Sequence, residues 1–143
     1  RRFVAKLYAP VQPTWGVNDR SVALRVPAGP VTARRVEHRP AGVDACPYMV
    51  GATVLAGMRR GMAHAIDPGP AADYQGFTQE TPFASAMPPD WRAAIAQAET
   101  SDFLKDALGP DLHRSFIAIK RAELFRITGS IPDTDYQLYL HQV

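Results

Sequence analysis

The sequence predicts an α+β fold, in which an antiparallel pair of strands is followed by helices. Two extended runs span residues 20–27 and 32–39. Pro27, Gly29 and Pro30 lie where the chain has to reverse between them, as expected for a hairpin or a strand–loop–strand unit. Because two strands alone form a marginal sheet, we expect either the helices or further strands to cover this pair.

The first helix after the strands is predicted to begin at Pro47 and to extend to about His64. Proline is favoured at the first helical position, where its missing N–H has no partner to lose. Nearly all residues of this segment are apolar or small, which is typical of a buried helix. We therefore expect Met49, Met58 and Met62 to belong to the core.

Two segments carry several prolines and glycines and predict irregular structure. Residues 1–16 are expected to form an irregular or extended lead-in, and residues 67–89 are expected to form a loop. After this loop, Asp90 is a suitable cap for a helix that extends through Gln97.

The rest of the chain predicts three more helical segments. Ser101 is expected to cap a helix that ends before Gly109, and Pro110 is expected to open a longer amphipathic helix. The core-facing positions predicted for this long helix are Leu112, Phe116, Ile119, Ala122 and Leu124. Thr134 is a candidate cap for a last turn or two at residues 135–140.

Length and charge limit the classes of function. A chain of 143 residues has room for one domain with a modest core. The net charge is +2 and the basic residues are spread along the chain, so neither nucleic acid nor an anionic membrane is demanded as a partner. The longest apolar stretch, residues 47–58, is shorter than the ~20 residues that span a bilayer.

The chain has a single cysteine, Cys46, and therefore no internal disulfide, which fits a cytoplasmic protein. A catalytic thiol needs a positioned base, and the sequence offers none for Cys46. We expect Cys46 to be a buried, structural thiol before a helix. The first residue is Arg1 and not Met, so we expect the chain to be part of a longer protein.

The second extended run carries charges of alternating sign. In a strand, alternate side chains share a face, so Arg35, Glu37 and Arg39 are predicted to lie on one face and Val36 and His38 on the other. This pattern is compatible with a solvated face of cross-strand ion pairs and also with a binding site. For His38, a packed or hydrogen-bonded role is favoured over metal ligation.

The first extended run adds two more arginines, Arg20 and Arg25. They are an odd number of residues apart, so they reach one site only if Arg20 precedes the strand or a bulge intervenes. Guanidinium groups match phosphate oxygens two at a time, and a lone carboxylate suits a Mg²⁺ ion shared with phosphates. Several guanidinium groups around Glu37 therefore indicate an anion held together with a cation.

Four segments together resemble the C-terminal motifs of the glutamine synthetase family, in their order and near their spacing. The segments are Trp15-Gly16, residues 18–25 (Asn-Asp-Arg-Ser-Val-Ala-Leu-Arg), residues 34–39 (Arg-Arg-Val-Glu-His-Arg) and residues 44–48 (Asp-Ala-Cys-Pro-Tyr). The resemblance implies that residues 1–143 are the C-terminal portion of a catalytic domain of this family. It also implies an ATP-dependent carboxylate–amine ligase that uses Mg²⁺ or Mn²⁺ and forms γ-glutamyl phosphate.

The resemblance implies a role for each matching residue around the phosphates. Arg20 corresponds to a catalytic arginine that reaches the transferred phosphate and the substrate. Arg25 and Arg35 correspond to arginines that hold the ATP phosphates, and Glu37 corresponds to a metal ligand. These roles suit phosphoryl transfer, in which a protein mainly positions groups and neutralises charge.

Three further residues are implied to contact the substrates. Arg39 corresponds to the catalytic arginine at the reacting carboxyl group of glutamate, and Arg2 to another glutamate-binding arginine. Tyr8, in the segment Ala5-Lys6-Leu7-Tyr8-Ala9-Pro10, replaces the acidic residue that covers the ammonium site in ammonia-using members. An aromatic ring there is similar to the γ-glutamylpolyamine synthetase type, because a ring packs on alkyl carbons or on a cation.

The departures from the family pattern leave alternatives open. Tyr8 is either a residue that selects a larger amine or a packing residue, and the parent is either a γ-glutamylpolyamine synthetase or a glutamine synthetase that uses ammonia. Cys46 stands where the family usually has asparagine, so the helix that follows is expected to be capped differently. A catalytically silent binding protein is opposed by the retained arginines, and a nucleic-acid-binding domain is opposed by Glu37 within the basic strand.

The resemblance also implies a homo-oligomer. Family members form double rings in which each site lies between neighbouring subunits. The remaining metal ligands of the family come from strands upstream of this segment, and one carboxylate does not hold two or three Mg²⁺ ions. We therefore expect residues 1–143 alone to be inactive.

Overall fold

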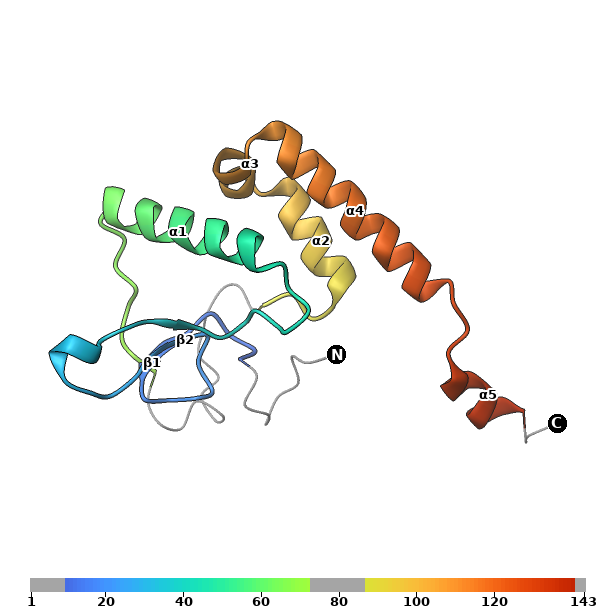
Figure 1. Ribbon diagram of the computed structural model, residues 1–143, viewed down its shortest axis with the longest axis horizontal. Coiled ribbons are helices and arrows are strands. Elements are labelled where there is room, and N and C mark those ends of the chain that lie inside the picture. Colours follow the sequence, from blue (N-terminus) through green and yellow to red (C-terminus); the bar gives the residue numbers. More distant parts are fainter. Residues whose placement is uncertain (1–9, 73–86, 141–143) are drawn as a thin grey trace. The chain divides into compact units, whose positions relative to one another are not determined.

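The computed structural model describes residues 10–72 and 87–140, and the chain forms two compact units. The first unit is Arg1–Asp90 and the second is Trp91–Val143. In Figure 1 the first unit contains the labelled strands and α1, and the second contains α2 to α5. Arg2 and Tyr8 lie outside the described residues.

The first unit is built on a small sheet with the strand order β1-β2-β3. The strands are β1 (Trp15–Val17), β2 (Leu24–Val26) and β3 (Glu37–His38). Strands β2 and β3 are antiparallel with Arg25 opposite Glu37, which confirms the predicted antiparallel pair. Strand β1 pairs with β2 in parallel, with Gly16 opposite Arg25. It lies in the predicted irregular or extended lead-in, so this lead-in supplies an additional strand.

Both predicted strands are shorter than expected. The first begins only at Leu24, because the residues before it form a turn around Asp19. The Oδ1 atom of Asp19 accepts hydrogen bonds from the Ser21 N–H and the Ser21 hydroxyl, both at 2.7 Å. Such local side-chain bonds compete with a strand ladder. The start of the second run is instead a 3₁₀ helix, η1 (Val31–Ala33), which follows Pro30 and ends where the Arg34 N–H donates to Val31.

Strands β1 and β2 are joined by only six residues, 18 to 23. Parallel neighbours usually need a connection of about a dozen residues or more. The connection starts with Asn18, whose φ of 56° lies in the left-handed region. The Asn18 N–H also donates to the Val26 carbonyl at 2.8 Å, so the end of β1 is tied directly to the end of β2.

The end of this connection supplies buried residues to the first unit. Val22 and Ala23 are 1% and 4% exposed. A Cβ atom at Gly16 would lie 3.2 Å from the Ala72 carbonyl oxygen and 3.3 Å from Val22 Cγ1, which is tighter than ordinary van der Waals contact. Because the Ala72 N–H donates to the Trp15 carbonyl at 2.7 Å, glycine at position 16 allows this close backbone approach.

Helix α1 (Pro47–Ala63) begins at the predicted proline and ends one residue before the predicted boundary. The expectation that it is buried is wrong: α1 lies wholly within the described residues and has no buried side chain. Met58 and Met62 are 55% and 76% exposed, and Met49 is half-buried. An apolar composition buries a helix only where another surface covers it, and the described residues do not cover α1.

The residue before α1 also differs from the expectation. Cys46 is exposed and not buried. It occupies the N-cap position of α1, and within the described residues its side chain makes no capping hydrogen bond. A thiol is a weak acceptor, so the helix starts on Pro47 without the side-chain cap that Asn, Asp or Ser provides.

The second unit consists of helices that start close to the predicted residues. They are α2 (Trp91–Thr100), α3 (Asp102–Leu108), α4 (Pro110–Thr128) and α5 (Asp133–Tyr139). The cap at Ser101 is confirmed, since its Oγ accepts from the Leu104 N–H at 3.2 Å. Helix α2 ends at Thr100, three residues beyond the predicted Gln97. Helix α5 starts after Pro132, before the predicted cap Thr134.

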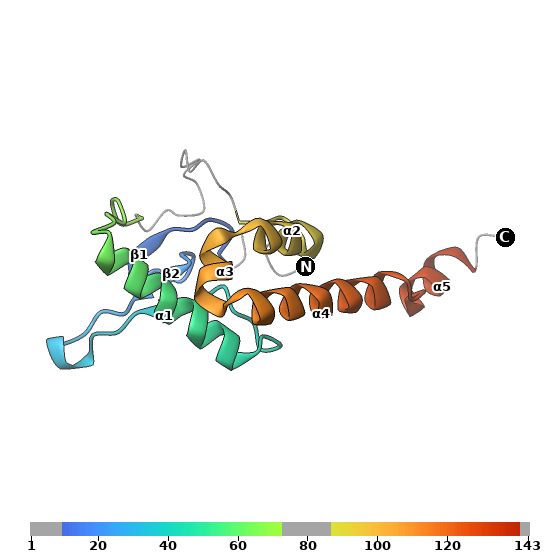
Figure 2. The same cartoon turned by 90° about the horizontal axis from the view of Figure 1, so that it is seen from above.

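Helices α2 and α4 pack side by side, with α3 at the turn between them (Figure 1). Their core contains Ile95 and Ile117, which are 7% and 5% exposed. The buried His113 joins them, with Nε2 2.8 Å from the Ala98 carbonyl oxygen. Helix α5 continues beyond the end of α4, after a short link (Figure 2).

The predicted core face of α4 is partly wrong. Phe116 and Leu124 are half-buried, but Ala122 is exposed, and Leu112 and Ile119 are 49% and 55% exposed. The buried face is rotated toward His113 and Ile117, because the imidazole finds a carbonyl partner on α2 and takes a core position. Within residues 10–72 and 87–140, no helix combines the length and apolarity needed to cross a bilayer.

Candidate functional site

The centre of the candidate site is the pair Arg25 and Glu37, on facing strands. The register of β2 and β3 places these two residues directly opposite one another, so their side chains share one face of the sheet. Arg25 Nη1 donates to Glu37 Oε2 at 2.9 Å. The Arg25 side chain is only 14% exposed, which makes this contact less solvated than an ordinary surface ion pair.

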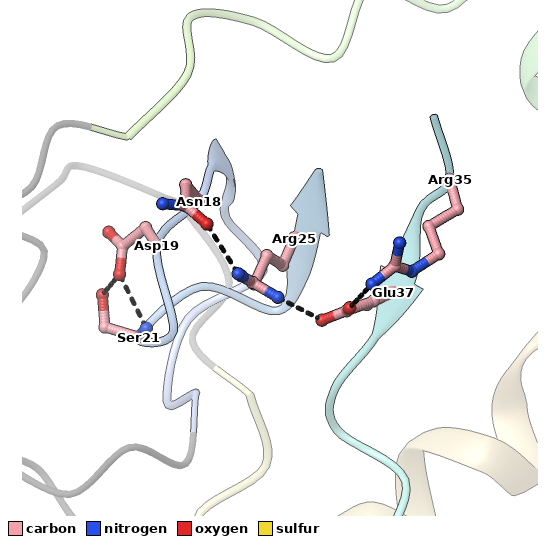
Figure 3. Close-up of polar contacts among 6 residues, drawn as sticks. All are labelled: Asn18, Asp19, Ser21, Arg25, Arg35 and Glu37. Atoms are coloured by element: carbon pink, nitrogen blue, oxygen red, sulfur yellow. Dashed lines mark hydrogen bonds and ion pairs between the residues drawn. The ribbon is translucent and has the colours of Figure 1, made fainter. Parts of the chain in front are cut away.

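Glu37 also contacts a second guanidinium group. Arg35 Nη2 donates to Glu37 Oε1 at 3.2 Å, from the residue two positions earlier in the same extended segment. Each carboxylate oxygen of Glu37 therefore accepts from a different arginine (Figure 3). The Arg35 side chain is 61% exposed, so the group of three residues opens to solvent on the Arg35 side.

The two arginines lower the pKa of Glu37 below its ordinary value. The hydrogen bond from Arg25 has the largest effect, and partial burial opposes it by raising the pKa. The charge of Arg25 and the hydrogen bond and charge of Arg35 lower the pKa further. Glu37 is thus a carboxylate at neutral pH, the form in which it is able to bind a cation.

On its other side, Arg25 contacts Asn18. Arg25 Nη2 donates to Asn18 Oδ1 at 2.6 Å, so the guanidinium group lies between an amide and a carboxylate (Figure 3). Asn18 stands at the end of β1 and Glu37 in β3, so Arg25 on the middle strand links all three strands through side chains.

Arg20 lies in the turn that Asp19 and Ser21 close. Asp19 is 7% exposed, and its Oδ1 accepts both hydrogen bonds from Ser21. Because β2 starts at Leu24, Arg20 precedes the strand, which is one of the two conditions under which Arg20 and Arg25 reach one site. The Arg20 side chain is exposed.

Arg39 directly follows β3. Its backbone N–H donates to the Ala23 carbonyl at 2.9 Å, which continues the pairing of the two strands by one residue. The residue is half-buried. The sequence predicts that Arg35, Glu37 and Arg39 share a face, which requires that residues 34–39 are not helical, and they are not. The contact of Arg35 with Glu37 places two of these three side chains together.

Glu37 fits one position in the coordination shell of Mg²⁺ or Mn²⁺. The carboxylate is ionised and is a hard oxygen ligand, which these cations prefer. Within residues 10–72 and 87–140, no group of three or more His, Cys, Asp or Glu side chains is arranged to hold a metal ion. At this site the described residues offer a cation the carboxylate of Glu37 beside two guanidinium groups, a set that suits a cation carried by phosphate oxygens.

Sequence reasoning missed Asn18, Asp19 and Ser21 as parts of the site. A signal was present, because Asn, Asp and Ser are all typical turn residues. Asn is also tolerated at positive φ. What the sequence does not show is that the turn brings the Asn18 amide to Arg25, since this contact depends on the pairing of β1 with β2.

The chain matches a family of known proteins over almost its whole length. Residues 1–139 match the family described as "Glutamine synthetase, catalytic domain". Gamma-glutamylputrescine synthetase PuuA of Escherichia coli K12 is 35% identical over 141 residues, which cover 98% of this chain and 29% of that protein.

Two other relatives carry different names. A glutamine synthetase of Methanococcus maripaludis is 30% identical over 146 residues, covering 98% of this chain and 32% of that protein. Lengsin of Rattus norvegicus is 34% identical over 115 residues, covering 80% of this chain and 20% of that protein. The chain thus spans between a fifth and a third of the length of these relatives.

Proposed function

Because this chain belongs to the glutamine synthetase family, we propose that the protein containing it is an ATP-dependent ligase that joins glutamate to an amine. Residues 1–143 form the C-terminal portion of its catalytic domain. The product is a γ-glutamyl amide, and the amine is larger than ammonia, as in a γ-glutamylpolyamine synthetase. The observation that carries this proposal is the ionised carboxylate of Glu37 between the guanidinium groups of Arg25 and Arg35.

The proposed reaction has two steps. The γ-carboxylate oxygen of glutamate attacks the γ-phosphorus of ATP, the bond to the bridging oxygen breaks, and ADP leaves with that electron pair. The amine nitrogen then attacks the carbonyl carbon of γ-glutamyl phosphate, inorganic phosphate leaves, and the nitrogen loses a proton. Both steps develop negative charge on oxygen atoms, which arginines stabilise.

Each arginine of the site has a proposed part in these steps. Arg25 and Arg35 bind the ATP phosphates, since guanidinium forks donate two parallel hydrogen bonds to phosphate oxygens. Arg20 contacts the transferred phosphate, and Arg39 contacts the reacting carboxyl group of glutamate. Glu37 would be one ligand of Mg²⁺ or Mn²⁺, which when bound neutralises charge on the phosphates.

Two further residues are proposed to bind the substrates. Arg2 contacts glutamate and Tyr8 contacts the amine, where a ring in place of a carboxylate removes the counter-charge for ammonium and offers apolar contact to an alkyl chain. The similarity to a protein named gamma-glutamylputrescine synthetase supports this amine assignment. A glutamine synthetase that uses ammonia is the second candidate, supported by the relative of that name with 30% identity.

The proposal extends to the setting of the enzyme. Glutamate and ATP as substrates fit a cytoplasmic protein. The protein is proposed to be a homo-oligomer with its sites at subunit boundaries, and residues 1–143 alone are proposed to be inactive, since Glu37 supplies a single carboxylate ligand.

The substrate assignment is tested on the full-length protein that contains this chain. ADP release is measured with glutamate, ATP and Mg²⁺, and with ammonium, putrescine, spermidine or ethylamine as the amine. We expect kcat/KM to be higher for a polyamine than for ammonium. A clear preference for ammonium would refute the amine assignment and favour the second candidate, whereas ADP release with none of these amines would refute the ligase.

A matched pair of arginine variants tests the site itself. Arg34 and Arg35 are adjacent and both exposed, but Arg35 contacts Glu37. We expect Arg35→Ala to lower kcat/KM for ATP by about tenfold or more, and Arg34→Ala to change it by less than about twofold. Equal effects of the two substitutions would show that general positive charge, and not the contact with Glu37, supports activity.

A further inference from the structure

We propose that Asn18 is a positioning residue that sets the orientation of the Arg25 guanidinium group for an anionic ligand. The inference rests on the proposed function, in which Arg25 binds the phosphates of ATP. The two contacts that define it are the 2.6 Å hydrogen bond from Arg25 Nη2 to Asn18 Oδ1 and the 2.9 Å ion pair from Arg25 Nη1 to Glu37 Oε2.

The orientation of this guanidinium group depends on its two terminal nitrogens. Arg25 Nε is buried and has no hydrogen-bond partner among the described residues. A guanidinium group is planar, so contacts at both ends fix its plane, whereas one contact leaves it free to rotate about that bond. Without the Asn18 amide, Glu37 would be the remaining side-chain partner of Arg25 in the described part of the chain, and Glu37 is shared with Arg35.

The backbone of Asn18 is itself held in place. Its φ of 56° lies in the left-handed region, which asparagine, aspartate and glycine tolerate better than other residues. The Asn18 N–H donates to the Val26 carbonyl at 2.8 Å, one residue beyond Arg25 on β2. The residue type therefore serves two purposes, since it permits the turn and supplies the acceptor.

The amide is also the acceptor that preserves the charge of the site. Arg25 and Arg35 carry two positive charges and Glu37 one negative charge, so the group has a net charge of +1 at neutral pH. An aspartate at position 18 would accept the same hydrogen bond but cancel the remaining positive charge. A neutral acceptor holds Arg25 and leaves its charge available to an anion such as a nucleotide phosphate.

Two substitutions of Asn18 separate the acceptor from the charge. Asn18→Gly keeps the permitted φ but removes the acceptor, and Asn18→Asp keeps the acceptor but adds a negative charge. Ala28→Gly is the control for glycine as such, because Ala28 is an exposed residue of the same unit. Each variant of the full-length protein is assayed for KM of ATP, KM of glutamate, kcat and Tm, at low and at high salt.

We expect Asn18→Gly to raise KM for ATP about 5- to 10-fold at both salt concentrations, with KM for glutamate and Tm close to those of the original protein. Asn18→Asp should raise KM for ATP by about tenfold at low salt. The ratio of its KM for ATP to that of the original protein should fall toward one at ~0.5 M salt, because salt screens the added charge. Ala28→Gly should leave all four quantities unchanged.

Three results would overturn the assignment of Asn18. They are a normal KM for ATP in Asn18→Gly, an equal rise in the KM values of ATP and glutamate together with a lower Tm, and an effect of Asn18→Asp that does not depend on salt. If the original protein releases ADP with none of the tested amines, the proposed function fails and the role of Asn18 fails with it. An active original protein with an unaffected Asn18→Gly variant refutes only the role of Asn18.

Discussion

The contacts within the first unit differ in kind from the contacts within the second unit. In the first unit, strands of two or three residues are linked by hydrogen bonds between charged and polar side chains, from Asn18 through Arg25 to Glu37 (Figure 3). In the second unit, helices α2 and α4 meet through buried Ile95 and Ile117. Ion pairs that remain partly open to solvent add little to stability, whereas a buried isoleucine adds several times more. Under the proposed function, the charged contacts serve ligand binding, whereas the apolar contacts of the second unit serve stability.

The largest effect is expected from removing the charge of Glu37. Glu37→Gln keeps the shape of the side chain but removes the ionised carboxylate that we propose as a metal ligand, so we expect kcat of the full-length protein to fall about 100-fold or more. The free energy of unfolding should change little, because the ion pairs of Glu37 are partly open to solvent. Steady-state kinetics and chemical denaturation check the two values. A variant that is fully active, or one that is strongly destabilised, would break the comparison between the two units.

A core substitution in α4 should mainly change the free energy of unfolding. Ile117→Ala is expected to lower the free energy of unfolding by about 2–4 kcal/mol, because Ile117 is 5% exposed and its loss leaves a cavity. Ile119→Ala is the matched control on the same helix, with an expected change of about 0.5 kcal/mol or less, since Ile119 is 55% exposed. Similar values for the two variants would mean that the buried face of α4 is assigned incorrectly.

Asp19 tests whether a polar group in the first unit supports stability. Asp19→Ala removes the acceptor of the Ser21 N–H and hydroxyl, and we expect a loss of about 1–3 kcal/mol. Asp19→Asn retains an acceptor and replaces Oδ2, which is buried and has no partner in the described part of the chain. Its cost should be smaller, at most about 1 kcal/mol. Denaturation curves in which asparagine costs as much as alanine would contradict a role for the acceptor.

The smallest effect is expected from pH. The pKa of Glu37 in the folded protein is lowered from its ordinary value of 4.5, first by the hydrogen bond from Arg25. A carboxyl group with a depressed pKa stabilises the folded state above pH 4.5, and this contribution is lost as the pH falls from there through the pKa of the folded state. Stability measured at decreasing pH should therefore drop more in the original protein than in Glu37→Gln. Parallel curves would show that the ion pairs of Glu37 do not stabilise the fold.

Local signals in the sequence predicted the starts of the helices well. Pro47, Ser101 and Pro110 act through the first turn of each helix, so their effect does not depend on the rest of the fold. Burial was predicted less well, because it depends on what covers a helix. The apolar pattern of α1 gave no warning that Met58 and Met62 are exposed, and a polar His113 was not expected in the core of α4.

Contacts of the candidate site were predictable where they follow from the alternation of side chains along a single strand. The contact of Arg35 with Glu37, two residues apart, is of this kind, and it was expected. The pairing of Arg25 with Glu37 required the antiparallel register, which the sequence indicated only as a reversal near Pro27 and Pro30. The contact of Asn18 with Arg25 required a parallel neighbour that no local pattern indicated.

The six residues between β1 and β2 form a compact connection that is fixed at several points. Asp19 and Ser21 close a turn within it, Val22 and Ala23 are buried at its end, and the Asn18 N–H at its start donates to the Val26 carbonyl. A designer who wants to retune this protein should accordingly exchange residues 18–26 together, because these contacts all lie within that one segment.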